Sequence, residues 1–206
     1  LHDALPICKT AVALYEQGIS SFEELLEKAK AGELSPRMAA NVLASESKLR
    51  RIPIETALEI AEPIKEALLR SGAKRVEVCG SIRRHSPSCK DIDIIVEPLE
   101  ESHGLVKKQF EGLGTVLWSG PVKSSIFVSN NGNQIQCDLW MVNGWHWGAA
   151  LNYTTGSKHH NERLRGMLKS RGMRLNEYGI YKPLEGVDLS HRKVVYGPKD
   201  ATIGGD

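Results

Sequence analysis

The chain of 206 residues lacks any apolar run near the ~18 residues that a membrane-spanning helix needs, which excludes such a helix. It has only four cysteines, with neither a Cys-x-x-Cys pair nor zinc-ligand spacing, as expected of a reduced, intracellular protein. Charge of one sign is not in large excess either, because 27 Lys and Arg residues stand against 25 Asp and Glu residues. The net charge of +2 therefore does not argue for nucleic acid by itself, and the composition is that of an ordinary globular protein.

The most informative segment combines a Gly80-Ser81 turn with two aspartates, Asp91 and Asp93, at the start of an apolar run. Side chains alternate along a strand, so both aspartates should project from one face while Ile92 projects from the other. Neighbouring carboxylates repel each other unless a cation lies between them, and their hard oxygens suit Mg²⁺. The turn offers N–H groups and a hydroxyl that could hold a phosphate. The segment predicts phosphoryl or nucleotidyl transfer.

The alternative interpretation is a surface strand with a solvent-facing Asp-x-Asp pattern after an ordinary turn. A third carboxylate, Asp138, favours the metal site over that alternative. It lies in a segment, 134–142, that alternates polar and apolar residues and follows a hairpin signal at 129–133. An aspartate on a neighbouring strand could complete a two-metal site, in which one ion activates the attacking oxygen and the other holds the triphosphate.

The remaining periodicity predicts an α+β fold with a mixed sheet. Helical spacing and end signals predict helices at 9–17, 22–30, 36–49, 53–69, 105–110, 144–151 and 158–171, the last one capped by Ser157. Alternation predicts strands at 76–78, 91–96, 115–117, 125–128 and 135–142, and a small strand pair at 173–175 and 179–181.

The segments 79–84, 91–93 and 153–157, with Asp138 before the last of them, resemble a family X DNA polymerase of the polymerase-beta-like group. The resemblance implies a remnant of helical fingers at 8–52, a nucleotidyltransferase palm at 53–150 and a small, incomplete α/β thumb at 151–206. Residues 1–7 are expected to be a non-native segment, and the chain is expected to be truncated at both ends. Trp145 and Trp147 are expected to pack between palm and thumb.

The same resemblance implies a repair-type, DNA-directed DNA polymerase. It would use two Mg²⁺ ions, with Mn²⁺ as a possible replacement, to add a deoxynucleoside triphosphate to a primer 3′-hydroxyl in gapped DNA or on a primer-template. We expect a monomer without a membrane partner, cytoplasmic in a bacterium and nuclear in a eukaryote. Two alternatives stay open: a template-independent or other nucleotidyltransferase, and a DNA-binding fragment with weak catalysis.

The resemblance also implies residue roles. Asp91 and Asp93 would hold both metals, and Asp138 would bind the catalytic metal. The residues expected at the nucleotide are Gly80, Ser81, Arg84, Lys90, Tyr153, Gly156 and Asn161, although Lys90 replaces a small residue common in the family. Six Lys or Arg residues against one acid between 158 and 174 predict a DNA-binding surface, with contacts from Arg163, Arg165 and Lys169, unless this is simply a solvated helix face.

Overall fold

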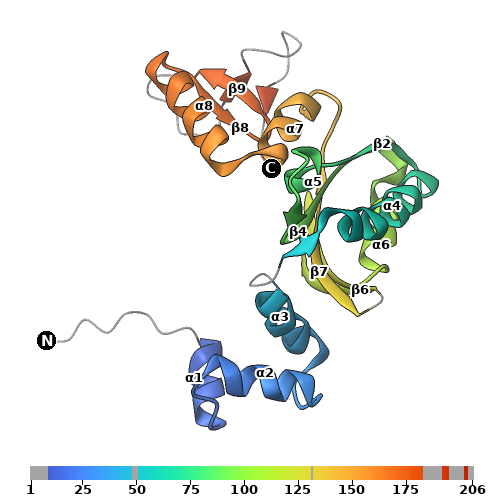
Figure 1. Cartoon of the computed structure of the whole chain (residues 1–206). Helices are drawn as coiled ribbons and strands as arrows, with labels where there is room; N and C mark the ends of the chain where they lie inside the picture. The colour runs from blue at the N-terminus through green and yellow to red at the C-terminus, as the bar shows by residue number, and fades with distance from the viewer. Residues whose placement is uncertain (1–8, 48–50, 131, 183–191, 195–201, 204–206) are drawn as a thin grey trace, which may run out of the picture.

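The computed structural model describes residues 9–47, 51–130, 132–182, 192–194 and 202–203. Three parts follow one another along a curve: helices at the N-terminal end, a sheet flanked by helices, and a second small sheet with helices (Figure 1). No helix in the described ranges has both the length and the apolar character needed to cross a membrane.

The first part consists of helices α1 (Lys9–Glu16), α2 (Phe22–Lys30) and α3 (Pro36–Ser47), as predicted. Helix α2 begins after Ser21, whose hydroxyl accepts a hydrogen bond of 3.1 Å from the Glu24 N–H. Its first turn is acidic and its last turn basic, which complements the helix dipole. Helix α3 reaches the central sheet, where Ala40 and Ala44 pack against Phe127.

The central sheet has five strands in the order β2 (Ala73–Val78), β4 (Asp91–Pro98), β7 (Asn133–Met141), β6 (Lys123–Asn130) and β5 (Thr115–Ser119). Strands β4 and β7 run parallel, whereas the other neighbouring pairs are antiparallel, so the sheet is mixed as predicted. The β6–β7 hairpin closes with Asn130 opposite Asn133, at the predicted turn. Two short strands, β1 (Ile52–Pro53) and β3 (Ser88–Cys89), form a separate antiparallel pair.

The core lies on one face of this sheet, which α4 (Ile54–Arg70) and α6 (His103–Glu111) cover (Figure 1). A short 3₁₀ helix, η1 (Glu100–Ser102), leads into α6. Ile92 and Ile94 are fully buried in this core, together with Ile60 and Phe110. Strand alternation therefore directs Asp91, Asp93 and their neighbours on β7 to the opposite face.

The last part contains α7 (Trp147–Thr155) and α8 (Lys158–Ser170), followed by a sheet in the order β11-β10-β9-β8. The bounds of its strands are β8 (Arg174–Asn176), β9 (Gly179–Lys182), β10 (Arg192–Val194) and β11 (Thr202–Ile203). Helix α7 begins later than predicted, because the Asn143 carboxamide accepts a hydrogen bond from the His146 N–H and forms a turn first; the helix also ends later, at Thr155. Trp145 is 71% exposed, so the prediction that it packs between palm and thumb is wrong.

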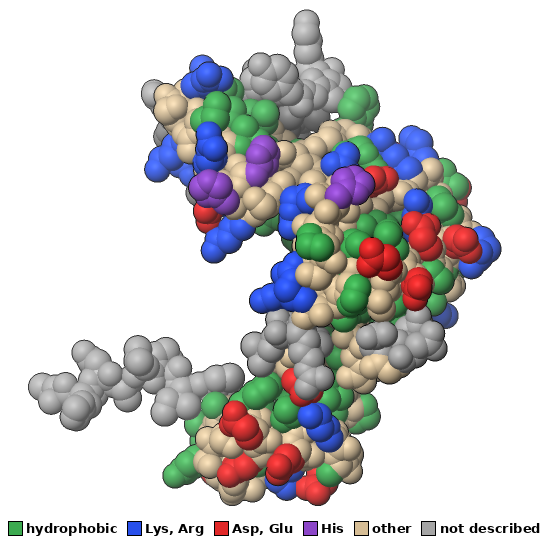
Figure 2. Space-filling view, in the orientation of Figure 1, with side chains coloured by type: hydrophobic (Ala, Val, Ile, Leu, Met, Phe, Trp, Pro, Cys, Tyr) green, Lys and Arg blue, Asp and Glu red, His purple; other side chains and the backbone are tan. Residues whose placement is uncertain are grey.

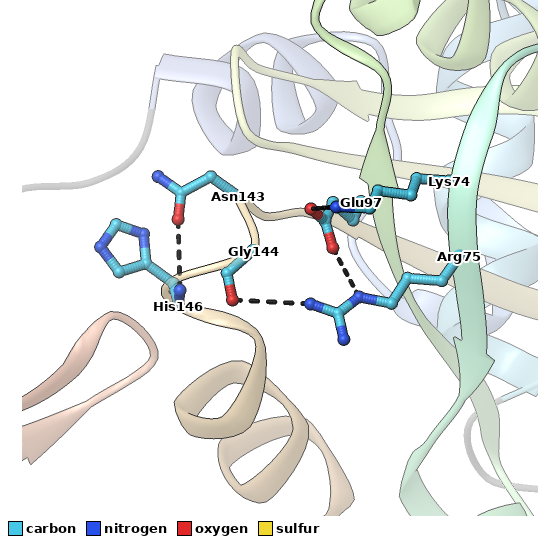
Figure 3. A network of polar contacts seen from close by, with 6 residues as sticks. All are labelled: Lys74, Arg75, Glu97, Asn143, Gly144 and His146. Carbon is cyan, nitrogen blue, oxygen red and sulfur yellow. Dashed lines mark hydrogen bonds and ion pairs between the residues drawn. The ribbon is translucent and has the colours of Figure 1, made fainter. Parts of the chain in front are cut away.

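A buried carboxylate links the central sheet to the start of α7 (Figure 3). Glu97, 7% exposed near the end of β4, accepts hydrogen bonds from Arg75 (2.5 Å) and Lys74 (3.2 Å). The Arg75 guanidinium also donates to the Gly144 carbonyl (3.5 Å) and lies 4.0 Å from the centre of the Trp147 ring. This network ties the segment that leads into α7, at Gly144, to strands β2 and β4.

We expect Glu97→Gln to lower the free energy of unfolding by about 1 kcal/mol at pH 7, a modest value because Lys74 and Arg75 are partly exposed. Burial alone would raise the pKa of Glu97, but the hydrogen bonds and charges of Lys74 and Arg75 outweigh it and lower the pKa below its usual 4.5. The stabilisation is therefore present above pH 4.5 and is lost as the pH falls through the lowered pKa.

Urea unfolding of both proteins across this pH range measures the effect. Glu66→Gln is the matched control, since Glu66 pairs with Arg70 on the exposed surface of α4 and should contribute little. An unfolding difference between parent and Glu97→Gln that does not shrink in acid would contradict the prediction.

Candidate active site

Three carboxylates meet on the face of the sheet that α4 and α6 leave uncovered. The parallel register places Asp93 of β4 directly beside Asp138 of β7, and Asp91 beside Gln136. Asp91 lies two residues before Asp93 and therefore projects from the same face. The structure thus brings together the three aspartates that the sequence predicted as metal ligands.

The electrostatics of Asp93 reflect this crowding. Burial, together with the charges of Asp91 and Asp138, raises the pKa of its carboxyl to about 7. Lys123 and Arg84 act in the opposite direction, but do not cancel these effects. A cation beside Asp93 would relieve the repulsion, which is the chemistry expected of a metal-binding carboxylate.

Unlike Asp93, Asp138 is surrounded by hydrogen-bond donors from neighbouring side chains of the sheet. Its Oδ2 lies 2.7 Å from the Lys123 ammonium, and its Oδ1 accepts hydrogen bonds from Ser125 and from Gln136 (2.8 Å). Burial alone would raise the pKa of Asp138, but these hydrogen bonds and the Lys123 charge outweigh it and lower the pKa. Both oxygens of Asp138 are therefore engaged, and the carboxylate is fixed in its ionised form.

The Gly80-Ser81 segment approaches the aspartates as the start of a one-turn helix, α5 (Gly80–Arg83), where the sequence predicted only a turn. The Cys79 N–H donates to the Asp93 carbonyl at 2.7 Å, which anchors the turn against β4. Gly80 has φ +56°, and a Cβ there would lie 2.4 Å from Asp93 Oδ2. Only glycine fits this position without displacing the carboxylate.

Arg84 joins this turn to the end of α7. One guanidinium nitrogen donates to the Ser81 hydroxyl (3.1 Å), and the other donates to the Thr155 carbonyl. Gly156 follows with φ +67°, and a Cβ there would lie 3.3 Å from the Arg84 guanidinium. A hydroxyl and a guanidinium are thus held beside the aspartates, as binding of a phosphate group requires.

A pocket of about 440 Å³ opens between these elements and helices α7 and α8. Its lining comprises Gly80, Ser81, Arg84, Asp91, Asp93, Trp140, Tyr153, Thr154, Gly156, Lys158, Asn161 and Arg165. Six of the seven residues predicted at the nucleotide line this pocket. Lys90 does not: it is exposed just before β4 and lies outside the lining, so its predicted position at the nucleotide is not supported by the geometry.

The far wall of the pocket is tied together by polar and aromatic contacts. The Asn161 amide donates to the Tyr153 carbonyl at 2.8 Å, which joins α8 to α7. The Tyr153 ring lies edge-on to Trp140 of β7, with ring centroids 5.8 Å apart. Tyr153 is therefore positioned by both helices and by the strand that carries Asp138.

Sequence reasoning missed the contributions of Lys123, Ser125 and Gln136. Lys123 had no assigned role, because the sequence places it near a turn and far from the Asp-x-Asp segment. A signal was available in the hairpin: in an antiparallel pair, Ser125 faces Asp138, and Lys123 lies two residues away on the same side.

The basic residues of α8 divide into two sets. Lys158 and Arg165 line the pocket, whereas Arg163 and Lys169 are exposed and lie outside its lining. Figure 2 shows Lys and Arg side chains gathered over α8 and along the inner edge of the curve, while Asp and Glu side chains gather over α4 and the N-terminal helices. This separation of charge gives the inner edge the sign that suits a phosphate backbone.

The donor set of the site suits a hard divalent cation, since it consists of carboxylate oxygens. Across the described ranges, no three His, Cys, Asp or Glu side chains are placed to hold a metal ion as they stand. Lys123, Ser125 and Gln136 bind both oxygens of Asp138. The carboxylates therefore have the chemistry that suits a metal ion. One of them, Asp138, is bound in this structure by the Lys123 ammonium.

The chain is similar to known DNA polymerases in sequence and in fold. Residues 150–199 match the family model described as DNA polymerase beta thumb. The chain is 29% identical over 185 residues to DNA polymerase/3'-5' exonuclease PolX of Bacillus subtilis, covering 87% of this chain and 30% of that protein. It is 25% identical to DNA polymerase lambda of Rattus norvegicus, covering 95% and 37%. The chain therefore spans about a third of the length of these two relatives.

Two further comparisons agree. Repair DNA polymerase X of African swine fever virus is 27% identical over 119 residues, covering 56% of this chain and 68% of the viral protein. A ternary primer-template complex of Leishmania infantum polymerase beta has a TM-score of 0.66 at 23% identity, covering 85% of this chain and 74% of that one, which shows a shared fold. The chain is thus similar to family X DNA polymerases in the matched C-terminal segment and in sequence, and it shares the fold of a polymerase beta.

Proposed function

We propose that the chain is a DNA-directed DNA polymerase of repair type, which adds a deoxynucleotide to a primer 3′-hydroxyl in gapped DNA. The observation that carries the proposal is the placement of Asp91, Asp93 and Asp138 beside the anion-binding Ser81 and Arg84 in or next to one pocket. This combination fits in-line displacement at a phosphate, where catalysis consists of positioning and charge neutralisation.

Each residue has a role that follows from its place. Asp91 and Asp93 would hold two Mg²⁺ ions, or Mn²⁺ in their place, and Asp138 would complete the site for the catalytic ion. When bound, the metal ions would activate the attacking oxygen and neutralise the charge of the leaving group. Ser81 and Arg84 bind the triphosphate through a hydroxyl and a fixed fork of donors.

The rest of the pocket would select and orient the nucleotide. Tyr153 and Gly156 line the pocket and would form the wall against the sugar, and Asn161, which donates to the Tyr153 carbonyl, would face the base. Arg165 reaches the pocket from the α8 surface, so the nascent pair and the DNA strand would meet there.

The proposal extends to domains and partners. We infer fingers at 8–52, a palm at 53–150 and a thumb at 151–206, all acting in a monomer in the compartment that holds the DNA. Solved structures of the Leishmania infantum enzyme are ternary complexes with a primer-template and with a gap, which supports DNA as the partner.

Primer extension by the purified chain tests the proposal. Labelled primers are presented in a one-nucleotide gap, on an open template and as a single strand, with Mg²⁺ and either the matched or a mismatched nucleotide. Templated addition that requires metal and is fastest in the gap is the expected result. Equal addition to a single strand would favour the template-independent alternative, and DNA binding without addition would favour the weakly catalytic fragment.

The basic surface of α8 gives a separate prediction for DNA affinity. Replacing Arg163, Arg165 and Lys169 together by glutamine should weaken binding to primer-template DNA and flatten its salt dependence. Each phosphate that is no longer neutralised reduces the slope of log K against log salt by about 0.9, so three such phosphates reduce it by roughly 2.7.

Fluorescence anisotropy at several salt concentrations measures both quantities. The matched control replaces Lys65, Arg70 and Lys107, which lie on the helices that cover the other face of the sheet. It removes the same charge and should change the slope much less. Equal slopes in the α8 variant and the parent would identify α8 as a solvated surface.

A further inference from the structure

Lys123 occupies a position that neither the pocket lining nor the proposed chemistry explains. It is the first residue of β6, and its ammonium lies 2.7 Å from Asp138 Oδ2 and 4.6 Å from the centre of the Trp140 ring. Its side chain is 28% exposed and that of Asp138 is 14% exposed, so this ion pair is shielded from water more than a surface pair.

The β6–β7 hairpin fixes this contact. Lys123 is paired with Trp140, and Ser125 is paired with Asp138, so both β6 side chains lie on the face that carries the aspartates. Ser125 and Gln136 hold Asp138 Oδ1, which leaves Oδ2 for the ammonium. The positive charge of Lys123 therefore sits at the ligand that a divalent cation would need.

We propose that Lys123 is an internal counter-charge that competes with the divalent cation for Asp138 and so sets the metal affinity of the site. The inference rests on the proposed function, since it assigns Asp138 to the metal. A cation and an ammonium bound to one carboxylate repel each other, so either one must weaken the binding of the other.

Trp140 gives the displaced lysine a second partner. Its ring already lies beside the ammonium, and attraction between a cation and an aromatic face persists when the carboxylate is occupied. The same ring contacts Tyr153 in the wall of the pocket. Cation binding at Asp138 is thus linked, through Lys123 and Trp140, to the wall against which the nucleotide would pack.

Direct titration of Mn²⁺, followed by electron paramagnetic resonance without DNA or nucleotide, tests the competition. Lys123→Met removes the charge and keeps the length of the side chain, so it should tighten Mn²⁺ binding by roughly 5- to 150-fold, the usual range for coupled ligands. Lys123→Arg should restore the parental affinity. Lys107→Met is the matched control, because Lys107 also lies 2.7 Å from a carboxylate, that of Glu111, and should leave Mn²⁺ binding unchanged.

A second measurement reports on the lysine itself. Mg²⁺ should change the tryptophan fluorescence of the parent, and this change should disappear in both Lys123→Met and Trp140→Phe. Lys123→Gln replaces the methionine variant if thermal unfolding shows that the latter is not folded.

The outcomes separate the inference from the proposed function. Unchanged or weaker Mn²⁺ binding in the uncharged variants overturns the competition, even where the parent extends primers. Tighter binding that Asp138→Asn abolishes supports the competition, even where no primer is extended. If the gain in Mn²⁺ affinity of the Lys123→Met protein persists after Asp138→Asn is added, the lysine acts on an ion held elsewhere, and the inference is also overturned.

Discussion

Replacing Asp93 by asparagine should reduce the rate of nucleotide addition by about 10²- to 10³-fold or more, with little change in the fold. Asparagine keeps the shape of the side chain but removes the charge that would bind both metal ions. The same change also removes a buried charge and its repulsion with Asp91 and Asp138, which together raise the pKa of Asp93 to about 7. We therefore expect the free energy of unfolding to stay the same or to rise, while activity is lost.

Single-turnover primer extension and urea unfolding of the same preparation measure the two effects. Glu59→Gln is the control. Glu59 is exposed on α4, the helix that covers the sheet face opposite the aspartates. Near-parental extension by the Asp93→Asn protein in Mg²⁺ would remove Asp93 from the metal site. Loss of activity with loss of folding would show only a structural role.

Gly80→Ala should also reduce activity strongly, although position 80 carries no functional group. The added Cβ would lie 2.4 Å from Asp93 Oδ2, so the carboxylate or the turn must move. A displacement of about 1 Å at a reacting centre costs on the order of 10²-fold in rate. The positive φ of Gly80 adds about 1–2 kcal/mol of backbone strain in alanine, so the free energy of unfolding should fall as well.

Gly104→Ala is the matched control for this change. Gly104 lies in α6, and the space within 4 Å of the position that an alanine methyl would take there is open, so alanine should be tolerated and should favour the helix. The comparison uses kcat and KM for one nucleotide in gapped DNA. If Gly80→Ala extends primers at the parental rate, Asp93 does not depend on the close approach of the turn.

The sequence by itself determined the elements whose signals are local. Asp91 and Asp93 share a face, opposite Ile92, because side-chain direction in a strand alternates with every residue. The β6–β7 hairpin and the cap of α8 at Ser157 also depend on neighbouring residues only. For this reason the longer helices, the strands of the central sheet and the α+β class could be predicted within a few residues of their observed bounds, whereas the one-turn helix α5 and the short strands β1 and β3 were not predicted.

Only the tertiary structure decided how these pieces meet. Asp138 stands beside Asp93 because β4 and β7 pair in parallel, an alignment of strands about 45 residues apart that no local pattern specifies. The packing of α5 near α7 likewise joins Arg84 to the Thr155 carbonyl, and Lys90 lies exposed outside the pocket. Lys123, by contrast, reaches Asp138 through the β6–β7 hairpin. The alternation of side chains along one strand depends only on the nearest residues. Which residue lies beside a carboxylate on the next strand depends on how distant strands pair and pack on one core.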